Sequence, residues 1–99
     1  MMQPLINVIA YVTAKPGNET VVERALKAAE QAVQAEAGCQ SYVLTQDIQQ
    51  PRRYVMLECW SSQEALDTHM QQPPFRKLLA EIDGLAELEV VVTKTLGQL

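Results

Sequence analysis

The sequence has few basic residues and no long apolar run, and each shortage excludes a class of protein. Its eight lysine and arginine residues are scattered and the net charge is −4, so we expect no basic surface for a nucleic acid backbone. No apolar run approaches the roughly 20 residues that span a membrane. The N-terminal MMQPLINVIAYV has neither a basic lead nor a cleavage site of small residues, so a secretory signal is not expected. The sequence therefore predicts a cytoplasmic protein.

Cysteine is also scarce. Cys39 and Cys59 lack the spacing of a metal site or of a CxxC redox motif. In a reducing compartment we interpret them as small apolar side chains of the core, with a disulfide across the expected hairpin as the alternative. The hydrophobic fraction of 47% suits a soluble globular protein, and residues 1–99 are expected to form a single domain because the chain is too short for two.

Most of the reactive side chains lie between Glu58 and Phe75. Just before and within this stretch, two sets of residues alternate with a period of two, which predicts a strand, and the second set is Val55, Leu57 and Cys59. Tyr54, Met56, Glu58 and Trp60 share one face of that strand. A carboxylate is therefore expected beside an indole.

A helix is predicted directly after this strand. Ser61 and Glu64 have the spacing of a capping box, in which each side chain satisfies a free backbone donor of the other residue. Pro73 and Pro74 end this helix and begin the next one, whose apolar stripe includes Phe75. The inward stripe of the first helix has 3.6-residue spacing and contains Ala65, Leu66, His69 and Met70. The only histidine of the chain is thus expected to lie over the sheet.

The other elements follow from the same two periods. Asn18 and Gly38 suit the start and the end of the first helix. The expected strands are 5–14, 39–46, 54–60 and 87–95, and the first helix is 19–37. The order β-α-β-β-α-β predicts a ferredoxin-like α+β fold, an antiparallel sheet with helices on one face. Because the strands carry apolar residues on both faces, we expect a homodimer joined through the uncovered sheet face.

Three short motifs occur at characteristic places: KPG after the first strand, EAGCQSY into the second, and ECWSSQEALDTH followed by PPF. In this order and spacing, over residues 6–95, they resemble the antibiotic biosynthesis monooxygenase superfamily of dimeric α+β barrels. The small quinol-oxidising proteins are the most similar branch, sharing the pattern of Glu58, Trp60 and His69. The resemblance implies a homodimer with a cavity between helices and sheet in each subunit. It also implies oxygenation of a quinol or phenolic polyketide by molecular oxygen, with no flavin, metal or other cofactor.

Such a reaction needs a base, because a phenolate anion passes an electron to oxygen more readily than the neutral phenol, and it needs a dry pocket. His69 is the candidate base, since its ordinary pKa near ~6.5 leaves it neutral in the cytoplasm. Glu58 is the candidate partner that orients His69; on a covered face it would contact His69, Tyr54 or a backbone donor. Trp60 offers a flat stacking surface. The other expected substrate contacts are Tyr54, Met56, Leu66 and Phe75.

Simpler interpretations remain open for each residue. His69 and Trp60 are also typical of a core, and Glu58 of a structural carboxylate at a strand end. Which of the three tyrosines lines a cavity cannot be decided from the pattern of Tyr11, Tyr42 and Tyr54. The alternative functions are a non-catalytic protein that binds a small aromatic and an isomerase of a phosphorylated signalling sugar. The isomerase branch keeps the Glu and the His but has Tyr in place of Trp60.

Overall fold

The sheet of this protein is built around two central strands. The computed structural model describes residues 3–97. β1 (Ile6–Ala14) pairs with β3 (Arg53–Trp60) on one side and with β4 (Ala86–Lys94) on the other, and β2 (Cys39–Gln46) pairs with β3. All three pairs are antiparallel, which gives the strand order β2-β3-β1-β4.

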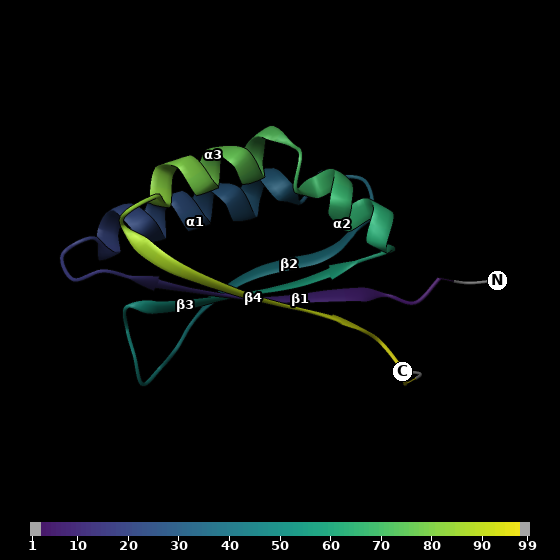
Figure 1. Ribbon diagram of the computed structural model, residues 1–99, viewed down its shortest axis with the longest axis horizontal. Coiled ribbons are helices and arrows are strands. Elements are labelled where there is room, and N and C mark those ends of the chain that lie inside the picture. Colours follow the sequence, from purple (N-terminus) through teal and green to yellow (C-terminus); the bar gives the residue numbers. More distant parts are fainter. Residues whose placement is uncertain (1–2, 98–99) are drawn as a thin grey trace.

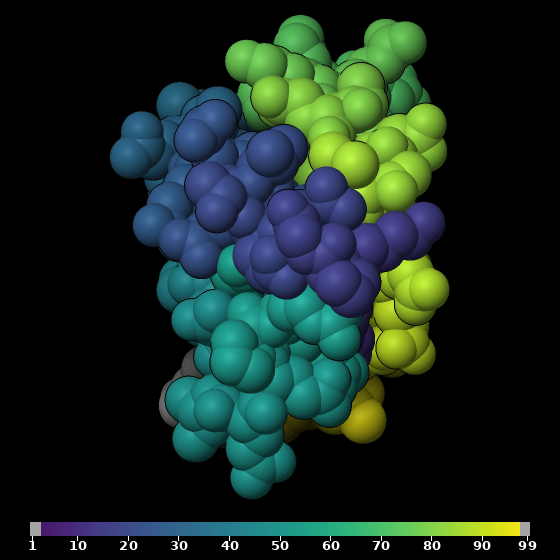
Figure 2. All heavy atoms as spheres, turned by 90° about the vertical axis from the view of Figure 1, so that its left-hand side faces the viewer, coloured from purple at the N-terminus to yellow at the C-terminus, as the bar shows by residue number. Residues whose placement is uncertain are grey.

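Within residues 3–97, three helices lie on one face of this sheet (Figure 1). They are α1 (Glu19–Val33), α2 (Gln63–His69) and α3 (Pro73–Ile82). α1 and α3 pack against each other, and Figure 2 shows them side by side at one end of the molecule. The expected ferredoxin-like α+β fold is confirmed, and the second helix is divided at the prolines as the sequence predicts. None of these helices is long and apolar enough to cross a membrane.

The core lies between the helices and the sheet. Every second residue of β1, and likewise of β3, is buried, because alternate side chains of a strand point to opposite faces. α1 buries one apolar stripe against them, as its period of 3.6 requires. The buried residues of α1 are Val22, Ala25, Leu26, Ala29 and Val33. Both cysteines are free, and Cys39 packs against this core.

The opposite face of the sheet carries an apolar row that crosses all four strands. In the register of the sheet, Val43 pairs with Leu57, Leu57 with Ile9, and Ile9 with Val91. Val43, Leu57 and Val91 are each more than two-fifths exposed. A contiguous apolar strip on the side without helices is the surface from which the sequence predicts a dimer.

Two helix ends differ from the expected positions. α1 ends at Val33 rather than at residue 37, because the chain tightens into a turn in which Glu36 N donates to Val33 O (3.0 Å). α2 is capped by Ser62, whose Oγ accepts from Ala65 N (3.1 Å), instead of by Ser61. The backbone N–H of Ser61 donates to the carbonyl of Gly38 (2.8 Å), so Ser61 belongs to the end of the sheet. The remaining boundaries agree with the sequence within one residue.

Gly38 joins the turn after α1 to the start of α2. Its φ is +83°, a conformation that side chains disfavour, and an added Cβ would overlap the Cβ of Ala65 and lie 2.8 Å from Ser61 Oγ. Only glycine fits this close approach without moving one of the two segments.

We predict that Gly38→Ala lowers the free energy of unfolding by about 2–4 kcal/mol. About 1–2 kcal/mol comes from the left-handed backbone and the rest from overpacking. Gly17→Ala is a matched control, because its φ is +86° and nothing lies within 4 Å of the added Cβ. It should cost only the backbone part, about 1–2 kcal/mol. Urea unfolding of both variants measures the difference, and equal losses would contradict the close packing.

Candidate functional site

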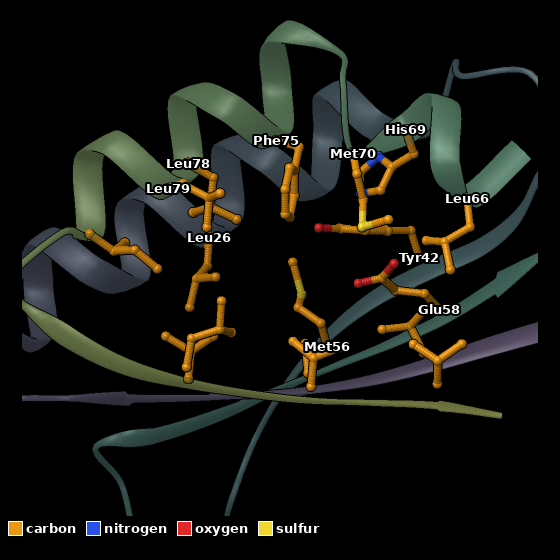
Figure 3. A pocket seen from close by; sticks show the side chains of 17 residues that line it. Leu26, Tyr42, Met56, Glu58, Leu66, His69, Met70, Phe75, Leu78 and Leu79 are labelled. Carbon is orange, nitrogen blue, oxygen red and sulfur yellow. The ribbon is translucent and has the colours of Figure 1, made fainter.

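A cavity lies between the helix layer and the sheet (Figure 3). Its empty volume is about 590 Å³, the open mouth included. Seventeen side chains line it, contributed by all four strands and all three helices. They are Val8, Ala10, Val12, Leu26, Tyr42, Met56, Glu58, Leu66, His69, Met70, Phe75, Leu78, Leu79, Ile82, Leu88, Val90 and Val92.

Polar groups gather at one end of this cavity. Figure 3 shows Tyr42, Glu58 and His69 together beneath α2, while Leu26 and Leu78 lie towards the other end. All other lining side chains are apolar. A ligand with one polar end and one apolar end therefore matches the lining.

The mouth of the cavity lies between the helices and β4. Met70 and Leu79 on the helix side are partly exposed, although they line the cavity. The same is true of Leu88, Val90 and Val92 on β4. The helices leave this edge strand uncovered, so β4 forms one lip of the opening.

His69 is held from two sides. Its ring stacks on Trp60, with 4.5 Å between the centroids and 29° between the planes. Its Nδ1 lies 2.8 Å from Oε1 of Glu36, a residue of the turn after α1. The rings of Tyr42 and Phe75 are also close, at centroid distances of 5.8 and 5.3 Å. Because Nδ1 is bonded to Glu36, Nε2 is the nitrogen left for a ligand.

Glu58 is buried among apolar residues on the sheet floor of the cavity. The indole Nε1–H of Trp60 donates to its Oε1 over 3.0 Å. Burial raises the pKa of Glu58 to about 7, the negative charge of Glu36 adds to this, and the hydrogen bond from Trp60 opposes it. At neutral pH the two forms of Glu58 are thus comparably populated, which suits a group that exchanges protons with a ligand.

Tyr42 brings a hydroxyl to the same end of the cavity. Burial raises its pKa well above the ordinary value, and the charges of Glu58 and Glu36 raise the pKa further. The phenol therefore stays protonated and can donate a hydrogen bond to an oxygen of a ligand.

With this geometry in view, we compared the chain with known proteins. Residues 5–81 match the family model described as antibiotic biosynthesis monooxygenase. The chain belongs to this family. The comparison with curated proteins gave no match.

Several solved structures share the fold of this chain. PA3566 from Pseudomonas aeruginosa has 30% sequence identity and a TM-score of 0.92, over 98% of this chain and 99% of that one. Rv0793 from Mycobacterium tuberculosis has 27% identity and a TM-score of 0.89, over 95% and 97%. A Bacteroides thetaiotaomicron protein of unknown function, described as a possible oxidoreductase, shares the fold at 20% identity, with a TM-score of 0.89 over 94% and 99%.

The sequence predicts seven site residues, and five of them meet at the cavity. They are Met56, Glu58, Leu66, His69 and Phe75. Met56 and Glu58 come from β3, Leu66 and His69 from α2, and Phe75 from α3.

The other two lie outside the cavity lining. Trp60 is fully buried and stacks on His69, so its ring is no stacking wall for a ligand in this conformation. Tyr54 lies further along β3, where its hydroxyl donates to Glu23 Oε1 over 2.9 Å. Burial and this hydrogen bond raise the pKa of Tyr54 to about 12. Both residues occupy the predicted face of the strand, but the helices above them leave no space.

The partner of His69 also differs from the expected one. Glu36 contacts the imidazole, while Glu58 accepts from Trp60. The sequence pattern does not single out Glu36, because it places residues 34–38 at the end of a helix and at its stop. Its place in the EAGCQSY motif was the available signal. Within residues 3–97, no group of three or more His, Cys, Asp or Glu side chains is arranged to hold a metal ion.

We predict that Glu58→Gln stabilises the protein at pH 8 but not at pH 4.5. The carboxyl titrates near 7 when folded and near 4.5 when unfolded. Between these values the unfolded state loses the proton first, so wild-type stability falls as the pH rises. Glutamine cannot ionise and still accepts from Trp60. The free energy of unfolding of Glu58→Gln, relative to that of the wild type, should rise by about 2–3 kcal/mol from pH 4.5 to pH 8.

Urea unfolding at several pH values tests this expectation. Glu64→Gln is the matched control, because Glu64 is exposed and the variant loses the same charge. Parallel stability profiles of wild type and Glu58→Gln would contradict a raised pKa at Glu58.

Proposed function

We propose that this protein is a cytoplasmic, homodimeric, cofactor-independent monooxygenase that acts on a quinol or a polyphenolic, polyketide-type small aromatic. The observation that carries the proposal is the cavity itself, which combines a histidine, a titratable carboxyl and a neutral phenol at one end with apolar walls elsewhere. Membership in the monooxygenase family supports the same reaction class.

The proposed reaction begins with the removal of a proton from a substrate hydroxyl. Nε2 of His69 accepts this proton, and the resulting anion transfers an electron to molecular oxygen. One oxygen atom is then inserted into a ring C–H bond, and the other leaves as water. The substrate supplies all four electrons, two as the quinol becomes a quinone and two as C–H becomes C–OH. A quinol and O₂ thus give a hydroxyquinone and water.

Each polar group has a role in this scheme. Glu58 exchanges the second proton of the quinol, because a pKa of about 7 allows the Glu58 carboxyl to donate and to accept a proton at neutral pH. Tyr42 donates to a substrate oxygen. The apolar walls keep water away from the anion, and Met56, Leu66 and Phe75 contact the substrate ring.

The composition of the lining favours this function over the isomerase alternative. A phosphorylated sugar would place its anionic group beside Glu58 or against aliphatic side chains, and both surroundings disfavour a phosphate. An aromatic with one hydroxylated end fits the same lining. A protein that only binds such an aromatic would use the same contacts, so turnover has to separate this alternative from the enzyme.

The proposed homodimer uses the apolar row Val43, Leu57, Ile9 and Val91. A second copy of the chain carries the same strip, so two copies related by a twofold axis bury it against itself. This removes the half-exposed valine and leucine side chains from water.

We expect metal-free, cofactor-free protein to accelerate oxygen uptake by an air-sensitive quinol such as menadiol above the spontaneous rate. His69→Ala should lower this enzymatic rate by about 10²–10⁴-fold, the usual contribution of a general base. With ¹⁸O₂, mass spectrometry should find one ¹⁸O atom in the product. Circular dichroism shows whether the variant remains folded.

The alternatives give different results in this assay. An isomerase of a phosphorylated sugar would neither use oxygen nor bind the aromatic, and saturable binding of the aromatic without oxygen use indicates a binding protein. Enzymatic uptake that a folded His69→Ala variant retains in full would rule out His69 as the base.

We expect the wild-type protein to sediment at twice the chain mass at micromolar concentration, and Leu57→Lys to sediment as a monomer. A lysine in the centre of the apolar row would have to bury its charge in the interface. Ile48→Lys is the matched control, because Ile48 is 95% exposed in the β2–β3 loop. It should leave the dimer intact. A wild-type monomer at this concentration would overturn the proposed dimer.

A further inference from the structure

The contact between Glu36 and His69 joins two segments that are 33 residues apart in the chain. Both side chains are largely shielded from water, with 15% and 2% of their surfaces exposed. In such surroundings a hydrogen bond to a carboxylate is stronger than in water. The contact is therefore able to decide which ring nitrogen of His69 carries the proton.

Backbone hydrogen bonds fix the turn that carries Glu36. Cys39 N donates to the carbonyl of Glu36 over 3.1 Å, which closes the turn at the start of β2. Gly38 O accepts from Ser61 N, which ties the turn to the segment that begins α2. The same helix carries His69 at its end. The carboxylate is thus held in place relative to the imidazole by the backbone on both sides.

The second oxygen of Glu36 adds an energetic argument. Within residues 3–97, Oε2 is buried and has no hydrogen-bond partner. A buried carboxylate with an unsatisfied oxygen is costly, so its one hydrogen bond, to Nδ1, is expensive to lose. An ionised carboxylate accepts hydrogen bonds only, and Nδ1 must therefore be the donor.

We propose that Glu36 is a positioning residue that holds His69 in the tautomer with its proton on Nδ1. The lone pair of Nε2 is then available for the proton of the substrate hydroxyl. When Nε2 takes up this proton, the carboxylate of Glu36 faces a full positive charge at 2.8 Å and stabilises it. The catalytic part of this role rests on the proposed oxygenase function. The inference about the tautomer of His69 is independent of that function.

Nitrogen-15 NMR of the imidazole tests the tautomer directly. His69 is the only histidine, so a tag-free protein gives one set of ring signals. When the ring is neutral, the wild type should show a protonated Nδ1 and an unprotonated Nε2. A wild type protonated mainly at Nε2 would overturn the inference without any variant.

Glu36→Gln provides the second test. An amide both donates and accepts, so it no longer imposes one tautomer, and a mixture of the two forms is expected. Oxygen uptake should fall at least about tenfold, since the neutral amide no longer stabilises the positive charge of the protonated ring and part of the base points its N–H at the substrate. Glu64→Gln, which changes the same charge on the exposed side of α2, should keep the wild-type tautomer and rate.

The two readouts separate the possible failures. A folded Glu36→Gln protein with an unchanged tautomer would overturn the positioning role, even if its activity were lost. A shifted tautomer in Glu36→Gln, together with no oxygen uptake by the wild type, would support the positioning role and count against the oxygenase.

Discussion

The rest of the structure depends on the antiparallel pairing of β1 with β3. This register places Val8 opposite Glu58 and Ala10 opposite Met56, so the small side chains of β1 lie beside the large and polar ones of β3. Space for a cavity exists above this pair because alanine and valine fill so little of it. The same apolar neighbours remove Glu58 from water, and its high pKa follows from that burial. The pairing of β1 with β3 thus accounts for both the cavity and the raised pKa of Glu58.

The cavity also shows how a small protein assembles a polar site from distant parts of the chain. Glu36 lies in a turn, Tyr42 on β2, Glu58 on β3 and His69 at the end of α2. The side chains meet because the turn after α1 and the start of α2 are tied together at Gly38. Aromatic stacking on Trp60 then fixes the plane of the His69 ring. Few degrees of freedom remain, which is the preorganisation that proton transfer requires.

Most of the fold could be predicted from the sequence, because it depends on local patterns. Alternation located the four strands within one residue, and the prolines divided the second helix. The site was predictable only in part. The two-residue period of β3 places Glu58 and Trp60 on one face of the strand. It does not show that α2 lies over Trp60 and hides this side chain from the cavity. The Glu36 contact depends on where a turn docks on a helix, and no local pattern records that.

The two faces of β4 serve different surroundings. Leu88, Val90 and Val92 form one lip of the cavity, while Val91, between them, belongs to the apolar row on the other face. Successive residues of this edge strand therefore alternate between an entrance and a flat outer surface. A slip of one residue in its pairing with β1 would exchange the two sets and put glutamate and threonine side chains at the entrance. The hydrogen-bond register of a single strand thus sets the polarity of the path into the cavity.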